Sequence, residues 1–172
     1  HLSLFGYDPQ KYSVGRGVLS AHGIDFEITP KDVAARGNFC SIDNNGEITD
    51  RRAGRISTEK NEELCKLLNE IKLSKGEIFV QTVKEHRFLF VLRGEGLCGS
   101  IHDTDPQTVG EKPLPPKPMK ADAQETAKLV EEFINKAEEK LKDHHPANGM
   151  VLRGFSMIPD WPTFNDTYGV RA

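Results

Sequence analysis

Two runs, Ile78-Phe-Val-Gln-Thr-Val83 and Arg87-Phe-Leu-Phe-Val-Leu92, decide the fold class of this 172-residue chain. β-branched and aromatic residues dominate both runs, and such residues favour strands. Between the runs lies the polar stretch Lys84-Glu-His86, which suits a tight connection between antiparallel strands. The sequence therefore predicts a β-hairpin over residues 78–92.

A second hairpin is predicted upstream of the first. Two extended stretches, Val33–Ile42 and Glu47–Ile56, are separated by Asp43-Asn-Asn-Gly46. Asn and Gly tolerate the backbone conformations that a tight hairpin turn requires. Pairing about this turn would bring residues near 36 toward residues 52–54.

Two amphipathic helices are predicted from apolar residues that recur at i, i+3, i+4 and i+7. The first helix is capped by Ser57 or Thr58, ends near Ser74-Lys-Gly76, and buries Leu64, Leu67, Leu68 and Ile71. The second helix starts where Asp122 and Glu125 have capping-box spacing, and its apolar stripe is Leu129, Val130, Phe133, Ile134, Ala137 and Leu141.

The remaining segments complete the expected fold. We predict a short helix over Val14–His22 closed by Gly23, strands over Asp25–Thr29 and Met150–Phe155, and irregular chain over Pro159–Pro162. Five prolines between Thr104 and Met119 predict an extended surface loop. Hairpins that alternate with helices predict an α/β (α+β-like) fold, in which helices cover a mixed sheet, and no Gly-rich nucleotide loop is present in the sequence.

The composition indicates one globular domain. The apolar share is 37% and the charged share 28%, and the longest apolar run, Phe88–Leu92, is too short to span a membrane. We therefore expect a cytoplasmic protein. The three cysteines lack Cys-x-x-Cys spacing, and the net charge of -3 gives no general attraction to nucleic acid.

The two ends suggest a piece of a longer chain. The sequence opens on His1-Leu-Ser-Leu-Phe without an initiator Met, and it stops at Tyr168-Gly-Val-Arg-Ala172, where another element would begin. We expect residues 1–172 to form a single domain cut from a larger protein.

The densest group of charges is Asp50-Arg-Arg-Ala-Gly-Arg-Ile56. On the predicted strand, Arg51 and Arg55 would share one face while Arg52 points to the other. Guanidinium groups bind phosphate and carboxylate through paired hydrogen bonds, so two converging arginines suit a small anionic ligand. Alternatively, the run is a solvated basic edge strand with Asp50 as its ion-pair partner.

Arg-Gly pairs and an Asp-x-Asp pair extend this pattern. Arg36-Gly37, Arg93-Gly94 and Arg153-Gly154 lie at strands, as they would if arginines lined one cleft, although coincidence gives the same pattern. Asp103-Thr-Asp105 offers two carboxylates that could accept a proton, hold a substrate hydroxyl or assist a metal, or else forms a turn before Pro106. The histidines show no spacing typical of metal ligands.

These motifs occur together in one known family. In chain order they are His1-Leu-Ser-Leu-Phe-Gly-Tyr-Asp-Pro9, Gly15-Arg-Gly-Val-Leu19, Arg36-Gly-Asn-Phe39, Asp50-Arg-Arg-Ala-Gly-Arg-Ile56, His86-Arg87, Asp103-Thr-Asp-Pro106, Arg153-Gly154 and Tyr168-Gly-Val-Arg171. The set resembles the archaeal-type cofactor-independent (2,3-bisphosphoglycerate-independent) phosphoglycerate mutases of the alkaline phosphatase superfamily.

The resemblance implies that the whole protein has two domains with different roles. In that family a metal-binding catalytic domain carries a nucleophilic hydroxyl, and a second domain is inserted into it. This chain resembles the inserted substrate-binding domain, with residues 1–12 and 156–172 as its connections to the catalytic domain. The implied glycolytic isomerase reaction interconverts 3-phosphoglycerate and 2-phosphoglycerate through a phosphoenzyme. It would use divalent Mn, Mg or Zn ions bound outside this chain and no 2,3-bisphosphoglycerate, so the chain alone would be inactive.

The resemblance also suggests roles for individual residues. The expected substrate-binding residues are Arg36, Asn38, Arg51, Arg55, His86, Arg87 and Arg153. The candidates for proton transfer or hydroxyl positioning are Asp50, Asp103 and Asp105. The expected partners are a phosphorylated metabolite and the catalytic domain of the same polypeptide, with neither nucleic acid nor membrane.

Two alternative functions stay open on the sequence. A homoserine-kinase-like phosphotransferase of the same family would use similar chemistry on another hydroxyl, and a non-catalytic module would bind phosphorylated metabolites only. The direct run His145-Pro-Ala-Asn148 is shorter than the family pattern, which leaves the identity of the substrate open.

Overall fold

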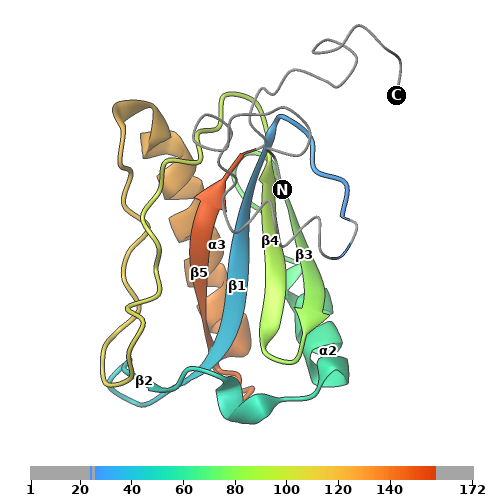
Figure 1. Ribbon diagram of the computed structural model, residues 1–172, viewed down its shortest axis with the longest axis vertical. Coiled ribbons are helices and arrows are strands. Elements are labelled where there is room, and N and C mark those ends of the chain that lie inside the picture. Colours follow the sequence, from blue (N-terminus) through green and yellow to red (C-terminus); the bar gives the residue numbers. More distant parts are fainter. Residues whose placement is uncertain (1–23, 25, 158–172) are drawn as a thin grey trace, which may run out of the picture.

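The computed structural model describes residues 24 and 26–157, which form one sheet with helices on one face (Figure 1). Its elements are β1 (Asp32–Ile42), β2 (Ile48–Asp50), η2 (Ala53–Arg55), α2 (Thr58–Leu68), β3 (Glu77–Lys84), β4 (Arg87–Arg93), η3 (Ala121–Ala123), α3 (Gln124–Leu141) and β5 (Gly149–Ser156).

Strand β1 is the centre of the sheet. It pairs with β4 on one edge and with β5 and then β2 along the other, and β3 pairs with the far edge of β4. Every pairing between the described strands is antiparallel. The expected α/β class, in which helices cover a sheet of hairpins, is confirmed, and the sheet that was expected to be mixed is antiparallel in its described strands. A bilayer-spanning segment is absent from the helices that the structure describes.

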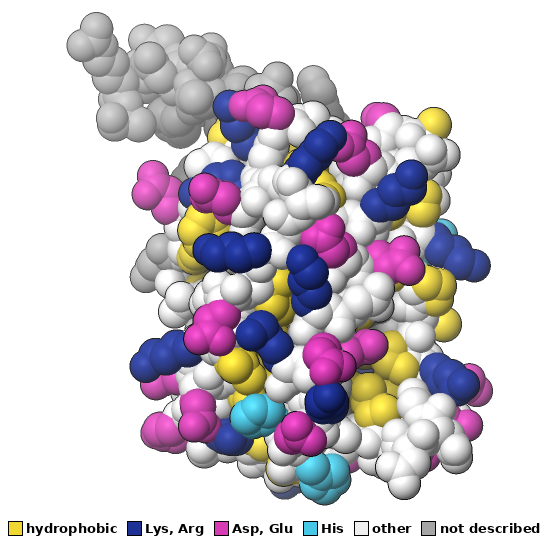
Figure 2. All heavy atoms as spheres, turned by 180° about the vertical axis from the view of Figure 1, so that it is seen from behind, with side chains coloured by type: hydrophobic (Ala, Val, Ile, Leu, Met, Phe, Trp, Pro, Cys, Tyr) yellow, Lys and Arg dark blue, Asp and Glu magenta, His cyan; other side chains and the backbone are white. Residues whose placement is uncertain are grey.

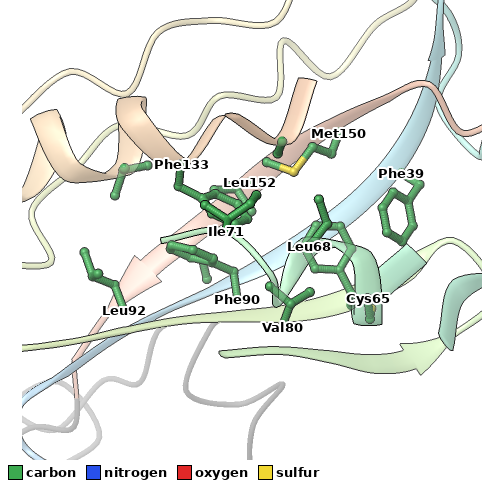
Figure 3. Close-up of a cluster of buried hydrophobic side chains, with 14 of the residues drawn as sticks. Phe39, Cys65, Leu68, Ile71, Val80, Phe90, Leu92, Phe133, Met150 and Leu152 are labelled. Carbon is green, nitrogen blue, oxygen red and sulfur yellow. The ribbon is translucent and has the colours of Figure 1, made fainter. Parts of the chain in front are cut away.

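The main core lies between the sheet and the two helices. Successive side chains of a strand alternate between its faces, and Val33, Ala35 and Phe39 of β1 face the helices. Figure 3 shows Phe90 of β4 against Phe133 of α3, and their ring centroids are 4.5 Å apart. Burial of such rings is a large stabilising term. It fixes the sheet relative to the helices.

Gly37 interrupts the apolar face of β1 because Phe88 occupies the space where a side chain would lie. The two residues are opposite each other in register, and a Cβ on Gly37 would lie 2.2 Å from the Phe88 ring. The ring is also held by Phe39, at a centroid distance of 4.6 Å. The glycine therefore allows a close contact inside the core.

The opposite face of the sheet is divided in two. Near one end, Ala34, Leu89 and Val91 pack with Phe26, Ile28, Phe79 and other partly buried residues. Farther along the same face, the alternation places Arg36 and Asn38 of β1 beside Arg87 of β4 and Arg153 of β5, because Asn38 pairs with Arg87 and Arg36 with Arg153. Polar groups thus replace the apolar cover where the sheet approaches β2.

The space-filling view of the other side of the molecule shows a different distribution of charge. On this face, acidic and basic side chains alternate, and neither sign gathers into one patch (Figure 2). Such mixed charge is typical of a solvated surface.

Several predicted elements are confirmed. The hairpin over 78–92 is formed by β3 and β4, the predicted last strand is β5, and the stripe of α3 is buried from Leu129 to Leu141 apart from the partly buried Ile134. The proline-rich stretch is an extended loop that runs beside β5 (Figure 1). There the Thr104 N–H donates to the Leu152 oxygen, and the Thr104 Oγ1 accepts from the Leu152 N–H.

Four local predictions are wrong. Residues 26–29 form no strand, although Phe26 and Ile28 still pack on the sheet. The first predicted helix ends at Leu68 and not near Ser74–Gly76, and Asn69 follows it and donates a hydrogen bond to the Val80 oxygen. Ile71 is buried, but it lies in the loop after the helix. Asp122 forms no capping box, because a 3-10 turn precedes α3. The strand predicted over Glu47–Ile56 ends at Asp50.

The helix predicted over Val14–His22 and the irregular chain over Pro159–Pro162 lie outside the described residues.

Candidate functional site

The arginine-rich motif forms a tight turn and not a strand. Asp50 ends β2 because its carboxylate accepts hydrogen bonds from the backbone N–H groups of Arg52 and Gly54, both at 2.8 Å. Such side-chain bonds compete with a strand ladder. The next residues, Ala53, Gly54 and Arg55, have φ values of 51, 64 and 58°, in the left-handed region. The expected pairing of Arg51 with Arg55 on one strand face is therefore wrong.

This turn places arginines around one cavity. The cavity has a volume of about 460 Å³, and its lining residues are Arg36, Arg52, Arg55, Glu85, His86 and Arg87. They come from β1, from the turn after β2, and from the hairpin between β3 and β4. Four guanidinium groups against one carboxylate give the cavity a strongly positive character, which suits an anionic ligand.

Buried polar atoms without hydrogen-bond partners gather at this face of the sheet. Among the described residues, these atoms are Asn38 Oδ1, His86 Nδ1, Arg87 Nε and Arg153 Nε. A buried polar atom that lacks a partner is costly, at about 1–3 kcal/mol. All four belong to residues that the sequence assigns to the site. Arg153 Nε faces the Asp105 carboxylate at 3.7 Å, and the pattern of the other three atoms is typical of a site whose partner is a ligand.

The surroundings of His86 favour the neutral form of its imidazole. Burial is the main cause that lowers its pKa below the ordinary value, and the positive charge of Arg87 adds to the effect. A neutral imidazole offers one donor and one acceptor. It therefore brings hydrogen bonds to the cavity without adding a fifth positive charge.

We expect the imidazole of ligand-free His86 to titrate below its ordinary pKa of 6.5. Between the folded pKa and 6.5 the unfolded chain binds more protons, so the free energy of unfolding should fall as the pH drops through this window. NMR titration of the ring and urea unfolding at several pH values would measure both effects. His86→Gln should lack this part of the fall, and a folded pKa above 6.5 would contradict the expectation.

Asp50 is held in its charged form. The hydrogen bond from the Arg52 backbone is the main cause that lowers the pKa of Asp50, and the bond from Gly54 lowers it further. Both carboxylate oxygens are occupied by backbone donors. This geometry supports a role for Asp50 in shaping the turn, more than in transferring a proton.

A second cluster adjoins the cavity, because Arg153 of β5 pairs with Arg36 of β1. Asp105 is buried, with 1% of its side chain exposed, and its Oδ2 lies 3.0 Å from a terminal nitrogen of Arg51 and 3.7 Å from Arg153 Nε. Asp103 accepts a hydrogen bond from the Gly154 N–H at 2.8 Å. The Asp-x-Asp segment thus anchors the extended loop to β5 and neutralises two of the predicted arginines.

The structure therefore divides the predicted site residues into two groups. Those that line the cavity are Arg36, Arg55, His86 and Arg87, with Asn38 beside Arg87 in register. Those in the neighbouring cluster are Arg51, Arg153, Asp103 and Asp105. The proximity of residue 36 to residues 52–54 is confirmed, since Arg36 and Arg52 line the same cavity.

Sequence reasoning missed Arg52 and Glu85. Arg52 was expected to point away, because the strand alternation was extended past Asp50. The signal that could have found it is Asp50 itself, since Asp side chains commonly accept a hydrogen bond from the backbone two residues on and so form a turn. Glu85 carries no such signal, because it lies at the tip of a hairpin and reaches the cavity only through tertiary contacts.

No group of three or more His, Cys, Asp or Glu side chains suited to a metal ion occurs within residues 24 and 26–157. The divalent ions that the resemblance implies stay a prediction about residues outside this chain.

Comparison with known proteins agrees with the resemblance. The family model described as 2,3-bisphosphoglycerate-independent phosphoglycerate mutase matches residues 1–148. Proteins named probable 2,3-bisphosphoglycerate-independent phosphoglycerate mutase from Thermus thermophilus and Aquifex aeolicus are 45% and 43% identical to this chain, over 98% and 99% of its length. The chain spans 42% and 44% of these relatives, less than half of their length.

Solved structures show the same relationship. The cofactor-independent phosphoglycerate mutase from Thermoplasma acidophilum superposes with a TM-score of 0.83 at 33% identity, over 96% of this chain and 47% of that one. The PH0037 protein from Pyrococcus horikoshii, at 22% identity and a TM-score of 0.68, shares the fold over 98% of this chain and 39% of its own. The present chain belongs to the 2,3-bisphosphoglycerate-independent phosphoglycerate mutase family.

Proposed function

We propose that this chain is the substrate-binding domain of a phosphoglycerate mutase that interconverts 3-phosphoglycerate and 2-phosphoglycerate. The cavity residues would hold the phosphate and the carboxylate of the substrate. The nucleophile and the divalent metal ions would come from a catalytic domain outside residues 1–172, into which this domain is inserted. We expect the whole protein to act in the cytoplasm.

The observation that carries this proposal is the arrangement of donors around the cavity. Four arginines from three separate segments converge on about 460 Å³, and Arg87 Nε among them is buried without a partner. Planar guanidinium groups match phosphate and carboxylate oxygens in pairs. A ligand with two anionic groups would therefore satisfy donors that the protein alone leaves unpaired.

The proposed reaction explains why the donors lie on different segments. Phosphate would pass from one glycerate oxygen to an enzyme hydroxyl and then to the other glycerate oxygen. The glycerate must stay bound and turn between the two transfers, and several separated donors can hold it in both orientations. Arg36, Arg52, Arg55 and Arg87 would grip the anionic groups, and Asn38 and neutral His86 would bind the hydroxyl. Asp103 and Asp105 remain candidates for hydroxyl positioning.

An NMR titration of the 172-residue chain with 3-phosphoglycerate tests the proposal. We expect amide shifts at Arg36, Arg52–Arg55 and His86–Arg87, which should be lost in Arg55→Ala. Parallel titrations with homoserine phosphate and inorganic phosphate separate the alternatives. Tighter binding of homoserine phosphate would favour the kinase-like function. Equal responses to all three ligands would leave only a general phosphate-binding module, and no response at millimolar concentration would refute the cavity as a binding site.

A further inference from the structure

The hairpin tip that carries His86 and Arg87 is tied to helix α2 by one buried amide. Asn61 of α2 is fully buried, and its Nδ2 donates to the backbone oxygens of Glu85, at 2.6 Å, and Arg87, at 2.7 Å. Its Oδ1 accepts a hydrogen bond from Cys65 Sγ at 3.0 Å. The Asn61 side chain thus has a partner at both ends.

Other contacts complete this attachment. The His86 oxygen accepts from the Phe39 N–H at 2.8 Å, so the carbonyl groups of residues 85, 86 and 87 are all held by other segments. Thr58, at the start of α2, accepts a hydrogen bond from the Glu85 N–H through its Oγ1, at 3.2 Å. The backbone of the tip has little freedom to move independently of α2 and β1.

A fixed tip matters because its backbone is strained and its side chains line the cavity. Glu85 has a φ of 53°, which costs free energy for a residue other than glycine. His86 Nδ1 and Arg87 Nε are buried without partners, so a small shift of the tip would let water reach them. Binding groups of this kind need to be held within about 0.5 Å of their working geometry.

The position of Asn61 is unusual on packing grounds alone. Its neighbours on the inner face of α2 are Leu64, Cys65 and Leu68, all buried. An amide at such a position is costly unless every polar atom is satisfied, whereas an apolar side chain would pack there without that requirement. We propose that Asn61 is a positioning residue, which holds the His86–Arg87 tip in the geometry that binds the anionic ligand. This inference rests on the function proposed above.

The same helix provides a matched control. Asn69, at the C-terminal end of α2, also makes two hydrogen bonds to the hairpin, from its Nδ2 to the Val80 oxygen and from the Val80 N–H to its Oδ1, both at 2.8 Å. It therefore joins α2 to β3 through an amide, as Asn61 does, but Val80 does not line the cavity. Loss of Asn69 should loosen the helix without moving the tip.

The test compares Asn61→Ala with Asn69→Ala in the whole chain, well below the melting temperature of each variant. Calorimetry should show that Asn61→Ala weakens 3-phosphoglycerate binding about tenfold, because the tip is displaced, while Asn69→Ala stays within about twofold of the parent. Thr58→Val, which removes one contact to the tip, should weaken binding in the same direction, and Thr58→Ser should restore it.

The titration of His86 without ligand gives an independent result. Burial and the charges of Arg87, Arg52 and Arg36 lower its pKa, and Glu85 opposes them. If Asn61 holds the tip, the pKa should rise toward its ordinary value in Asn61→Ala and stay unchanged in Asn69→Ala. An unchanged His86 pKa in Asn61→Ala, or equal losses of affinity in the two variants, would overturn the inference. If the parent chain itself does not bind 3-phosphoglycerate, the proposed function fails, and the titration alone still decides the role of Asn61.

Discussion

Replacing Arg52 and Arg55 together by Gln should weaken 3-phosphoglycerate binding at least about a hundredfold, since a hydrogen bond to a charged group contributes about 1.5–3 kcal/mol and each 1.4 kcal/mol corresponds to about tenfold. Both side chains are exposed in the free chain and line the cavity. Arg55 already has a positive φ, so Gln at this position meets the same backbone strain as Arg. The fold should therefore persist while binding is lost.

The control for this double variant removes the same amount of charge elsewhere. Lys66 and Lys128 are exposed residues of α2 and α3, and neither lines the arginine cavity. Calorimetry on Lys66→Gln/Lys128→Gln should give nearly the affinity of the parent. If this control binds as weakly as the arginine variant, net charge and not the cavity governs binding, and the assignment of the site is wrong.

A single conservative change separates charge from geometry. Arg55→Lys keeps the positive charge but removes the planar fork that pairs with two oxygens. We expect it to bind more weakly than the parent and more tightly than Arg55→Gln. Equal affinity of Arg55→Lys and the parent would show that Arg55 acts only through its charge.

Gly37→Ala should lower the free energy of unfolding by about 3 kcal/mol, the upper end of the usual cost of overpacking a core. The new Cβ would lie 2.2 Å from Cε2 and Cζ of Phe88, a distance that forces a shift of the ring or of the strand. The ring is fully buried and packs against Phe39, so it has no free space to enter. Urea unfolding measured by circular dichroism would give the free energy directly.

Two further variants show whether the steric contact is the cause. Gly96, unlike Gly37, has a positive φ, of 69°, and nothing lies within 4 Å of a Cβ built there, so Gly96→Ala should cost only about 1 kcal/mol through backbone strain. Combining Gly37→Ala with Phe88→Leu removes part of the obstruction, so the double variant should be less destabilised than the sum of the two single variants. Strict additivity would contradict the steric explanation.

The parts of the fold that were predicted correctly depend on patterns within one segment. The β-branched and aromatic runs of β3 and β4 favour a hairpin that packs one face on a core. The apolar stripe from Leu129 to Leu141 favours a helix that packs on any apolar surface. The incorrect predictions depend on competition between local bonds and longer-range ones. Residues 26–29 have strand-like alternation, yet no strand of the described sheet pairs with them.

The candidate site was predicted in composition but not in arrangement. The motif resemblance identified Arg36, Arg55, His86 and Arg87, which do line one cavity. The arginines were expected on a strand, but the strand ends at Asp50, whose carboxylate accepts hydrogen bonds from two backbone N–H groups. As a result, Arg52 lines the cavity, and Arg51, which was expected there, pairs with Asp105. The Asp50 side chain thus determines the directions in which the arginines of the motif point.

By itself, the sequence determined the fold class, the two main helices, the β3–β4 hairpin and the chemical character of the site, because periodicity and residue type act over short distances along the chain. Only the tertiary structure decided which arginines share a cavity and which are neutralised by Asp105. It alone also showed that Asn61 donates hydrogen bonds to the backbone of the hairpin tip. These arrangements join residues tens of positions apart, and their energies depend on burial and direction, which no local pattern encodes.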